Sequence, residues 1–320
     1  MATYTKLNQS DAQKLADNYH LQITKLTPLD GGNGNSSHLI QAGQDTYVLT
    51  VCDDKTFDEV LKMGKLLLLL ETYKVPCNRL ISTYNCEIII TYSSNRGDKA
   101  VMLKSYIEGQ VVEVLNEAML IEVGKQAAKL NQIAPPDYLQ NNHPYGRQLF
   151  GNVIGLNIDL EYEAWMAKEI NYLEQHLSDE LPRGLIHGDL FFDNLLFDDK
   201  SGELVFKAII DFEEACHYYS VFELGMAAIG SCLDEDTSVN LDKVRALVTG
   251  YQQIRTLRSI EKQNLQLFIR YGAIATSYWR FNKYNIEEPD VDKATHHWQM
   301  VQLANEISNI PESQFLDAIF

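Results

Sequence analysis

The chain is poor in positive charge. Its 320 residues include 27 lysines and arginines against 44 aspartates and glutamates, so the net charge is −17 at pH 7. Proteins bind nucleic acids largely through lysines and arginines that neutralise phosphates, so this balance argues against a nucleic-acid partner and against a basic membrane-binding patch. An acidic cleft for a cationic substrate would agree with the charge, but solubility alone also accounts for it.

Cysteines and long hydrophobic runs are also scarce. The five cysteines form no Cys-x-x-Cys pair, which argues against a zinc site and against a disulfide framework. The leucine run at 66–70 is far too short to cross a bilayer, and the first residues lack the apolar core of a signal peptide. We therefore expect a protein of the reducing cytoplasm. The length and the hydrophobic content of 45% allow a large core and two lobes.

The most informative stretch runs from residue 185 to residue 214. Two short apolar runs, at 194–197 and 205–210, flank a turn at 198–202, which predicts a β-hairpin. His187, Asp189 and Asn194 come before or at the start of the first strand, and Asp211 directly follows the second. We therefore expect Asp189, Asn194 and Asp211 to converge at one end of a small sheet.

These residue types suit phosphoryl transfer. The carboxylate of Asp189 can accept the proton of an attacking hydroxyl, and such a base typically contributes ~10²–10⁴-fold in rate. The amide oxygen of Asn194 and the carboxylate of Asp211 are hard ligands that suit Mg²⁺. The alternative is a surface hairpin with acidic ends, since aspartates are frequent in turns.

The series His-Gly-Asp-Leu-Phe-x-Asp-Asn, followed by Asp-Phe-Glu, resembles the catalytic and metal loops of the protein-kinase-like superfamily. It looks most like the small-molecule branch of aminoglycoside phosphotransferases, choline kinases and homoserine kinases. The resemblance implies ATP and Mg²⁺ as cofactors. It also implies that His187 braces the catalytic loop; the alternative role of general base would compete with Asp189.

The same resemblance implies an α+β, two-lobed protein-kinase-like fold. Residues 1–104 would form an N-terminal nucleotide-binding lobe around a small antiparallel sheet. Residues 105–320 would form a larger, mainly helical lobe that holds the catalytic and substrate residues. We predict helices at 10–19, 57–73, 116–131, 160–177, 241–255, 259–282 and 294–307, the first capped by Ser10. Strands are expected at 46–52, 87–92 and 100–104.

A glycine-rich tip is the first candidate for nucleotide binding. Gly31, Gly32, Asn33 and Gly34 join two predicted strands and could lay backbone N–H groups over phosphates, although glycine-rich turns often serve only to turn. No Gly-Lys-Ser/Thr follows, so this is not a Walker loop. Its place before the catalytic loop is similar to that of the phosphate-covering loop of the superfamily.

Thr50 stands where most members of the superfamily carry a phosphate-binding lysine. Either the chain is a degenerate kinase, or it belongs to a branch that positions ATP without this lysine; homoserine kinases resemble it in having Leu-Thr here. Glu59 is the nearest candidate for the usual glutamate partner, and losing both members of an ion pair is physically coherent. The segment 101–109 resembles the hinge, where backbone groups around Lys104 and Tyr106 would bind adenine; an edge strand ending at glycine is the alternative.

Glu223 lies where relatives carry an aspartate that binds the backbone of the catalytic loop. The glutamate could do the same, or it could be an acid at the start of a helix, favoured by the macrodipole.

The acceptor of the phosphoryl group is predicted from the same resemblance to be homoserine, which carries an ammonium and a carboxylate. Candidate residues for the ammonium are Asp193, Glu213 and Glu214, and Arg270 or Arg280 would bind the carboxylate. The alternatives are an aminoglycoside or a choline/ethanolamine phosphotransferase, whose cationic acceptor would need acids and no arginine. A nucleotide-binding pseudokinase is favoured by Thr50 and opposed by the combination of Asp189, Asn194 and Asp211.

Overall fold

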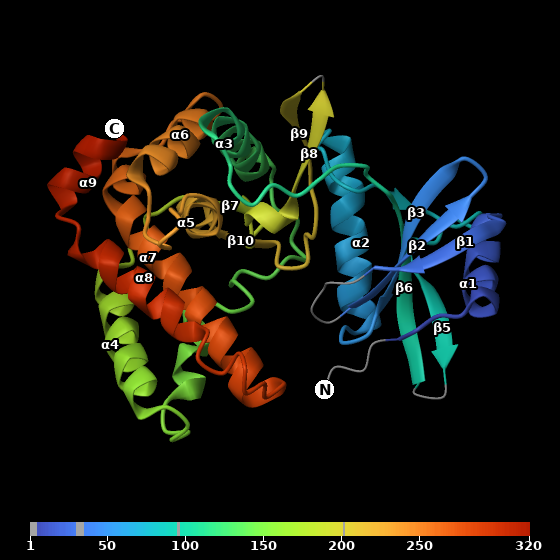
Figure 1. The fold of residues 1–320 in the computed structure, drawn as a ribbon, viewed down its shortest axis with the longest axis horizontal. Helices are drawn as coiled ribbons and strands as arrows, with labels where there is room; N and C mark the ends of the chain where they lie inside the picture. Colours follow the sequence, from blue (N-terminus) through green and yellow to red (C-terminus); the bar gives the residue numbers. More distant parts are fainter. Residues whose placement is uncertain (1–4, 30–34, 95–96, 201) are drawn as a thin grey trace. The chain divides into compact units, whose positions relative to one another are not determined.

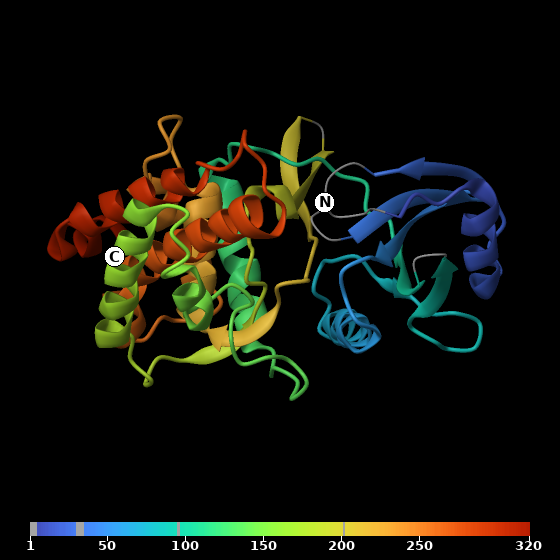
Figure 2. The same cartoon turned by 90° about the horizontal axis from the view of Figure 1, so that it is seen from below.

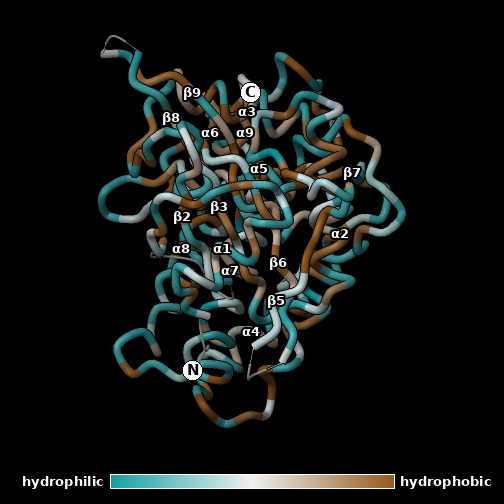
Figure 3. The backbone as a smooth tube through the Cα atoms, turned by 90° about the vertical axis from the view of Figure 1, so that its right-hand side faces the viewer, coloured by the Kyte–Doolittle hydropathy of each residue, from teal (hydrophilic) through white to brown (hydrophobic). Residues whose placement is uncertain are grey.

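A computed structural model describes residues 5–29, 35–94, 97–200 and 202–320. The chain forms two compact units: unit 1 comprises Met1–Gly109 with Ala208–Ile210, and unit 2 comprises Gln110–Lys207 with Asp211–Phe320. Within the described ranges no helix is long and apolar enough to cross a membrane. Figure 3 agrees, because hydrophobic and hydrophilic segments alternate along the chain.

Unit 1 is built on an antiparallel sheet. Its strands are β1 (Ile23–Pro28), β2 (Asn35–Ala42), β3 (Asp45–Cys52), β4 (Leu80–Ile81), β5 (Ile90–Ser94) and β6 (Gly97–Ser105). They are ordered β1-β2-β3-β6-β4, and β5 also pairs with β6. A two-residue turn joins β2 to β3, where Gly43 adopts a φ of 63° that a hairpin turn favours and glycine tolerates. The strand predicted at 46–52 is confirmed as β3.

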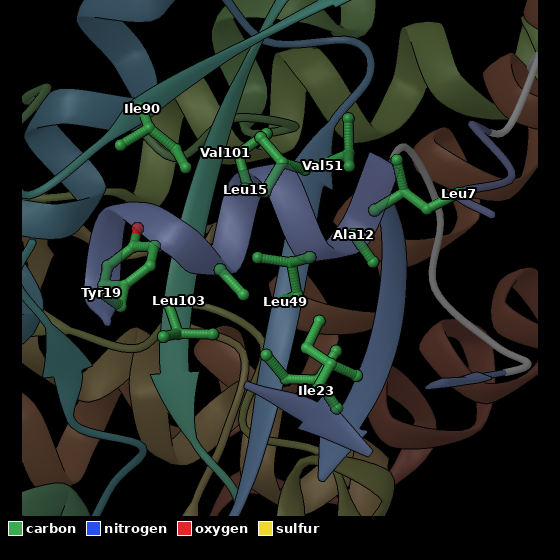
Figure 4. Close-up of a cluster of buried hydrophobic side chains, with 12 residues drawn as sticks. Leu7, Ala12, Leu15, Tyr19, Ile23, Leu49, Val51, Ile90, Val101 and Leu103 are labelled. Carbon is green, nitrogen blue, oxygen red and sulfur yellow. The ribbon is translucent and has the colours of Figure 1, made fainter. Parts of the chain in front are cut away.

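The short helix α1 (Gln9–Ala16), which a 3₁₀ turn η1 (Asp17–Tyr19) extends, covers one face of this sheet. Ala12, Leu15 and Tyr19 point toward Leu49 of β3 and Leu103 of β6, in a cluster of buried side chains (Figure 4). Asn8, and not the predicted Ser10, caps α1 by accepting the N–H of Asp11 at 2.9 Å. Both residue types are good caps, and they lie only two positions apart, so the sequence did not separate them.

The helix α2 (Phe57–Thr72) lies on the other side of the sheet from α1 (Figure 1). Thr56 and Glu59 form a capping box at its start, with the carboxylate of Glu59 accepting the N–H of Thr56 at 2.7 Å. This contact satisfies N–H groups that the helix itself cannot bond. Glu59, the nearest candidate for the partner of the absent lysine, therefore caps its own helix.

Unit 2 is mainly helical. Its helices are α3 (Glu117–Gln132), α4 (Leu160–His176), α5 (Ser220–Ser231), α6 (Leu241–Gln252), α7 (Ser259–Asn282), α8 (His297–Asn309) and α9 (Glu312–Ile319), with shorter turns η2 (Arg147–Val153), η3 (Phe192–Asn194) and η4 (Lys283–Glu287). Helix α5 lies among α3, α6 and α7 and is buried nearly all round, while α4, α7 and α8 lie side by side (Figures 1 and 2). The predicted helix at 259–282 is confirmed with the same bounds as α7.

Two pairs of strands in the second half of the chain carry the loops of interest. Strand β7 (Arg183–Ile186) pairs with β10 (Cys216–Tyr219), and β8 (Leu195–Lys200) pairs with β9 (Glu203–Ile209). The second pair confirms the predicted hairpin, but β8 continues to Lys200, so the turn is shorter than the one predicted at 198–202. The α+β class with an antiparallel sheet and a larger helical part is also confirmed.

Candidate active site

Strand pairing brings two loops together in unit 2. The first, 187–194, leaves β7, and the second, 211–215, enters β10. Ile186 is paired with Cys216, so the start of one loop lies beside the end of the other. This register explains how residues more than twenty positions apart in the sequence reach one place.

Asp189 and Asn194 are in direct contact. The side-chain amide nitrogen of Asn194 donates to Oδ2 of Asp189 at 3.1 Å and to the backbone carbonyl of Asp189 at 2.8 Å. Because the NH₂ group faces Asp189, the amide oxygen is the atom that remains to accept a cation. Asn194 is buried and Asp189 is half-buried, so this orientation is held by the surrounding structure.

Two further carboxylates influence Asp189. Burial raises the pKa of Asp189 to about 6, and the negative charges of Asp193 and Asp211 add to the rise. Burial likewise raises the pKa of Asp193, with Asp211 contributing again. Asp211 is exposed and has a φ of 63°, a strained conformation that clusters at functional sites. Carboxylates in mutual repulsion beside an amide oxygen are a donor set that fits a hard divalent cation.

His187 is completely buried in the first loop, 187–194, which is the candidate catalytic loop. Its Nδ1 accepts the backbone N–H of Asp189 at 3.2 Å, and its ring meets the ring of Phe212 edge-on with centroids 4.7 Å apart. A histidine that bonds the loop backbone and packs against its neighbour has the geometry of a brace. The role of general base is not supported by these contacts.

Glu223 binds the backbone of the catalytic loop, the first of its two predicted roles. Its Oε1 accepts the N–H of His187 at 2.8 Å, and its Oε2 accepts the N–H of Gly188 at 3.0 Å. It also stands in the first turn of α5, so the macrodipole adds to the same arrangement. Burial raises the pKa of Glu223 to about 7, although both N–H groups favour the charged form.

Two residues that the sequence analysis did not select lie against this loop. The hydroxyl of Tyr145 donates to Oδ1 of Asp189 at 3.1 Å, and Nε2 of His143 lies 2.9 Å from the carbonyl of Gly188. Both come from an irregular segment without hydrophobic periodicity or a familiar motif. The only local signal was the His-Pro-Tyr-Gly series at 143–146.

The residues predicted to bind nucleotide have mixed outcomes in unit 1. Gly31, Gly32, Asn33 and Gly34 lie outside the described residues. The side chain of Thr50 is buried, and its hydroxyl lies 3.2 Å from the hydroxyl of Ser37 on the neighbouring strand. The hydroxyl of Thr50 therefore has a partner within the sheet, and its predicted place in the nucleotide site stays a prediction.

Part of the segment predicted to be the hinge belongs to the sheet of unit 1. Lys104 is paired with Val48 of β3 and with Leu80 of β4. The N–H of Tyr106 donates to the carbonyl of Thr46 at 3.2 Å. The strand pairing of Lys104 and the N–H of Tyr106 are therefore used within the sheet, and a contact of this segment with adenine stays a prediction.

The predicted acceptor-binding residues divide into two groups. Asp193 lies in η3 within the catalytic loop, and Glu213 and Glu214 follow Asp211 in the second loop, so the structure brings the acids to one region of unit 2. The arginines are placed differently. Arg270 donates to both carboxylate oxygens of Glu169 at 2.7 and 2.9 Å.

Arg280 donates to the carbonyl of His296 at 3.2 Å and to Gln299 at 2.8 Å. Ten residues separate Arg270 from Arg280, which is about 15 Å along a helix, so both could not serve one small acceptor. The ion pair with Glu169 corrects the expectation for Arg270, whose guanidinium already holds a buried carboxylate. Arg280 bonds a carbonyl and an amide oxygen, both through one nitrogen, so its role in binding the acceptor carboxylate stays a prediction.

Comparison with known proteins shows the family and the fold of the chain. The model of the phosphotransferase enzyme family matches residues 25–257, and the chain therefore belongs to that family. The homoserine kinase of Paramagnetospirillum magneticum is 26% identical over 286 residues, which cover 86% of each chain. The fold is shared with a microcompartment-associated aminopropanol kinase, with a TM-score of 0.75, 18% identity, and coverage of 97% of this chain and 100% of the other.

A second solved structure has the same fold. An amicoumacin kinase in complex with AMP-PNP and Ca²⁺ has a TM-score of 0.72 and 14% identity, and the match covers 96% of this chain and 95% of the other. The predicted kinase-like fold is thereby confirmed, and the chain is an enzyme of the small-molecule kinase class, a phosphotransferase.

Proposed function

We propose that the protein transfers the γ-phosphoryl group of ATP to the hydroxyl of a small amino-containing metabolite, with homoserine as the first candidate. The contact between Asp189 and Asn194, close to Asp211, is the observation that carries the proposal. A base, an amide oxygen and a second carboxylate in one place meet the needs of phosphoryl transfer, which depends mainly on positioning and charge stabilisation.

Each residue has a distinct role in this mechanism. Asp189 accepts the proton of the acceptor hydroxyl. At the same time the hydroxyl oxygen of the acceptor bonds to the γ-phosphorus, and the bond between this phosphorus and the ADP oxygen breaks. Asn194 and Asp211 would hold Mg²⁺, which neutralises phosphate charge when bound. His187 and Glu223 fix the backbone that presents Asp189. Gly31, Gly32, Asn33 and Gly34 are proposed to cover the phosphates.

Homoserine is favoured because the relatives that match most of the chain are named homoserine kinases. Its ammonium would meet Asp193, Glu213 or Glu214. Its carboxylate needs a cation, and we assign Arg147 to it in place of Arg270, with Arg280 as the alternative.

Arg147 begins η2, two residues after Tyr145, and its side chain is half-buried. Its backbone N–H donates to the hydroxyl of Tyr271 at 2.9 Å, which ties the start of η2 to α7. Arg255 and Arg270 of the same unit are paired with glutamates, whereas no carboxylate pairs with Arg147 in the described part of the chain. A half-buried guanidinium without an acidic partner suits a carboxylate ligand.

The second candidate is an aminoglycoside or choline/ethanolamine phosphotransferase. The acids around Asp189 favour it, because a purely cationic acceptor needs no arginine. In that case Arg147 would repel the acceptor and its removal would improve binding, whereas removal would weaken binding of homoserine. A pseudokinase remains the least supported alternative, since Asp189, Asn194 and Asp211 would have no reason to stand together.

The test is ADP release with Mg·ATP against L-homoserine, L-serine, L-threonine, choline, ethanolamine and several aminoglycosides. The Asp189→Asn variant is measured alongside, with ATP binding followed by calorimetry. Turnover with homoserine that disappears in the variant, while ATP still binds, supports the proposal. If turnover occurs with a different acceptor, that compound takes the place of homoserine as the proposed substrate. Full activity of the Asp189→Asn variant overturns the role of Asp189 as the base.

A further inference from the structure

A short segment of unit 2 touches the catalytic loop at two points beside the candidate base. His143 and Tyr145 lie on this segment, and both side chains are almost wholly buried, with exposed fractions of 0% and 9%. One contacts the carbonyl of Gly188 and the other contacts the carboxylate of Asp189, the next residue. Nothing in the resemblance to known kinases assigns a role to either residue.

The contact with Gly188 fixes the hydrogen position on His143. A backbone carbonyl can only accept, so Nε2 must carry the hydrogen that donates across 2.9 Å. Burial lowers the pKa of His143 to about 4, so the ring is neutral at pH 7 and needs no counter-charge. Its other nitrogen, Nδ1, has no hydrogen-bond partner among the described residues, so the bond to Gly188 is its anchor.

Gly188 is held from both sides. Its N–H donates to Glu223 and its carbonyl accepts from His143. Its φ is +85°, and a Cβ at this position would lie 2.7 Å from the carbonyl oxygen of Glu214 and 3.0 Å from Nε2 of His143. Only glycine fits this space, which shows how closely His143 approaches the backbone that carries Asp189.

Tyr145 and Asn194 together occupy both oxygens of Asp189. The hydroxyl of Tyr145 donates to Oδ1, and the amide of Asn194 donates to Oδ2, each at 3.1 Å. The carboxylate therefore cannot rotate without losing a bond, and each oxygen keeps a lone pair for an incoming proton. The ring of His143 meets the ring of Tyr145 edge-on, with centroids 4.2 Å apart, so the two residues also hold each other.

We propose that Tyr145 is a positioning residue for phosphoryl transfer, which orients the carboxylate of Asp189 toward the acceptor hydroxyl, and that His143 supports it by fixing Gly188. The inference rests on the proposed role of Asp189 as the base. The hydroxyl proton of the acceptor moves to Asp189 while the hydroxyl oxygen of the acceptor bonds to the γ-phosphorus. The bond between this phosphorus and the ADP oxygen breaks in the same step. Tyr145 keeps its own proton throughout.

The Tyr145→Phe variant removes the hydroxyl and leaves the ring on His143. We expect kcat to fall about 10- to 100-fold, because a poorly oriented base loses rate while binding is retained. The KM values for ATP and for the acceptor should stay within about twofold, since only the base and not the substrates lose a contact. The matched control is Tyr92→Phe, which removes a tyrosine hydroxyl that faces Asp11 in unit 1 and should leave kcat unchanged.

His143 is tested by the paired variants His143→Gln and His143→Ala. Glutamine carries an N–H₂ donor that can replace Nε2, whereas alanine cannot, so we expect kcat to decrease from wild type to glutamine to alanine. All rates are expressed per folded molecule, with the folded fraction taken from the thermal melt. These assays use the acceptor that gives turnover in the panel described above. If no acceptor gives turnover, ATP hydrolysis is measured, with water as the acceptor.

The outcomes separate this inference from the proposed function. Loss of turnover in both Asp189→Asn and Tyr145→Phe, with KM preserved in the second, supports both. Loss in Asp189→Asn with a normal kcat in Tyr145→Phe overturns the positioning role alone. A raised acceptor KM with an unchanged kcat in Tyr145→Phe also overturns it, because the hydroxyl would then contact the substrate. Full activity of Asp189→Asn overturns the base and the inference with it.

Discussion

Glu223 accepts the N–H of Gly188 at 3.0 Å from the first turn of a buried helix. The exposed fraction of Glu223 is 0%, so its carboxylate is withdrawn from water and depends on the two backbone donors it meets. The same contact satisfies N–H groups that a tight loop cannot bond by itself. The loop that carries Asp189 is therefore anchored to the helical core by one side chain.

Replacing this anchor should destabilise the protein strongly. Glu223→Ala leaves two buried N–H groups without acceptors, and each unsatisfied group costs about 1–3 kcal/mol. We expect the free energy of unfolding to fall by about 3 kcal/mol, with a smaller loss in Glu223→Gln, which keeps one acceptor oxygen. Urea denaturation measures both variants. Equal stability of Glu223→Ala and wild type would contradict the anchoring role.

The stability of the protein should depend on pH through His143. Burial lowers its pKa in the folded protein from 6.5 to about 4, so the unfolded chain binds the proton more readily. Acidification from pH 6.5 to 4 therefore favours unfolding, by about 3 kcal/mol at about 1.4 kcal/mol per unit. Glu223 shifts the opposite way, from 4.5 to about 7, so its contribution falls as pH rises through that window.

The pKa of Asp189 is also raised in the folded protein, so its contribution falls with rising pH as that of Glu223 does, and wild-type stability alone does not isolate His143. His143→Gln removes only the histidine contribution. The difference in the free energy of unfolding between wild type and His143→Gln should therefore grow in favour of wild type as the pH rises from 4 to 7. A difference that does not change with pH would show that His143 does not titrate at different pH values in the folded and unfolded states.

The dependence of turnover on Mg²⁺ concentration should distinguish the role of Asp211 from that of Asp189. If Asp211 holds Mg²⁺, Asp211→Asn removes a charged ligand and raises the Mg²⁺ concentration needed for half-maximal turnover. We expect this concentration to rise at least about 10-fold, because a hydrogen bond or ligand contact to a charged group is typically worth 1.5–3 kcal/mol. Asp189→Asn should leave it unchanged, measured on whatever activity remains or by calorimetry with Mg·ATP. Equal metal requirements in wild type and Asp211→Asn would contradict the assignment.

The sequence predicted the parts of the site that depend on local patterns. The hairpin and the helix at 259–282 have clear periodicity and turn residues, and Glu223 could be selected by its place after the second loop. His143 and Tyr145 could not be selected, because their partners lie more than forty positions away and their segment has no regular pattern. The partner of Arg270, Glu169, is 101 positions away, so an arginine on a helix facing other helices looked available.

This difference between Arg270 and Arg147 leads to opposite effects of two similar substitutions. The side chains of Arg270 and Glu169 are only 15% and 5% exposed, and the guanidinium also lies 4.0 Å from the centre of the Tyr172 ring. Removing one member of a buried pair leaves the other charge unpaired, which typically costs about 3–5 kcal/mol.

Arg270→Met should therefore lower the free energy of unfolding by an amount of this order, while the KM for homoserine stays unchanged in the folded fraction. Arg147→Gln should instead raise that KM about 10- to 100-fold with little loss of stability, because a hydrogen bond to a charged ligand is lost. The double variant Glu169→Gln, Arg270→Met should recover part of the stability, since no buried charge then lacks a partner. An Arg270→Met protein that is stable but has a raised KM would return the carboxylate-binding role to Arg270.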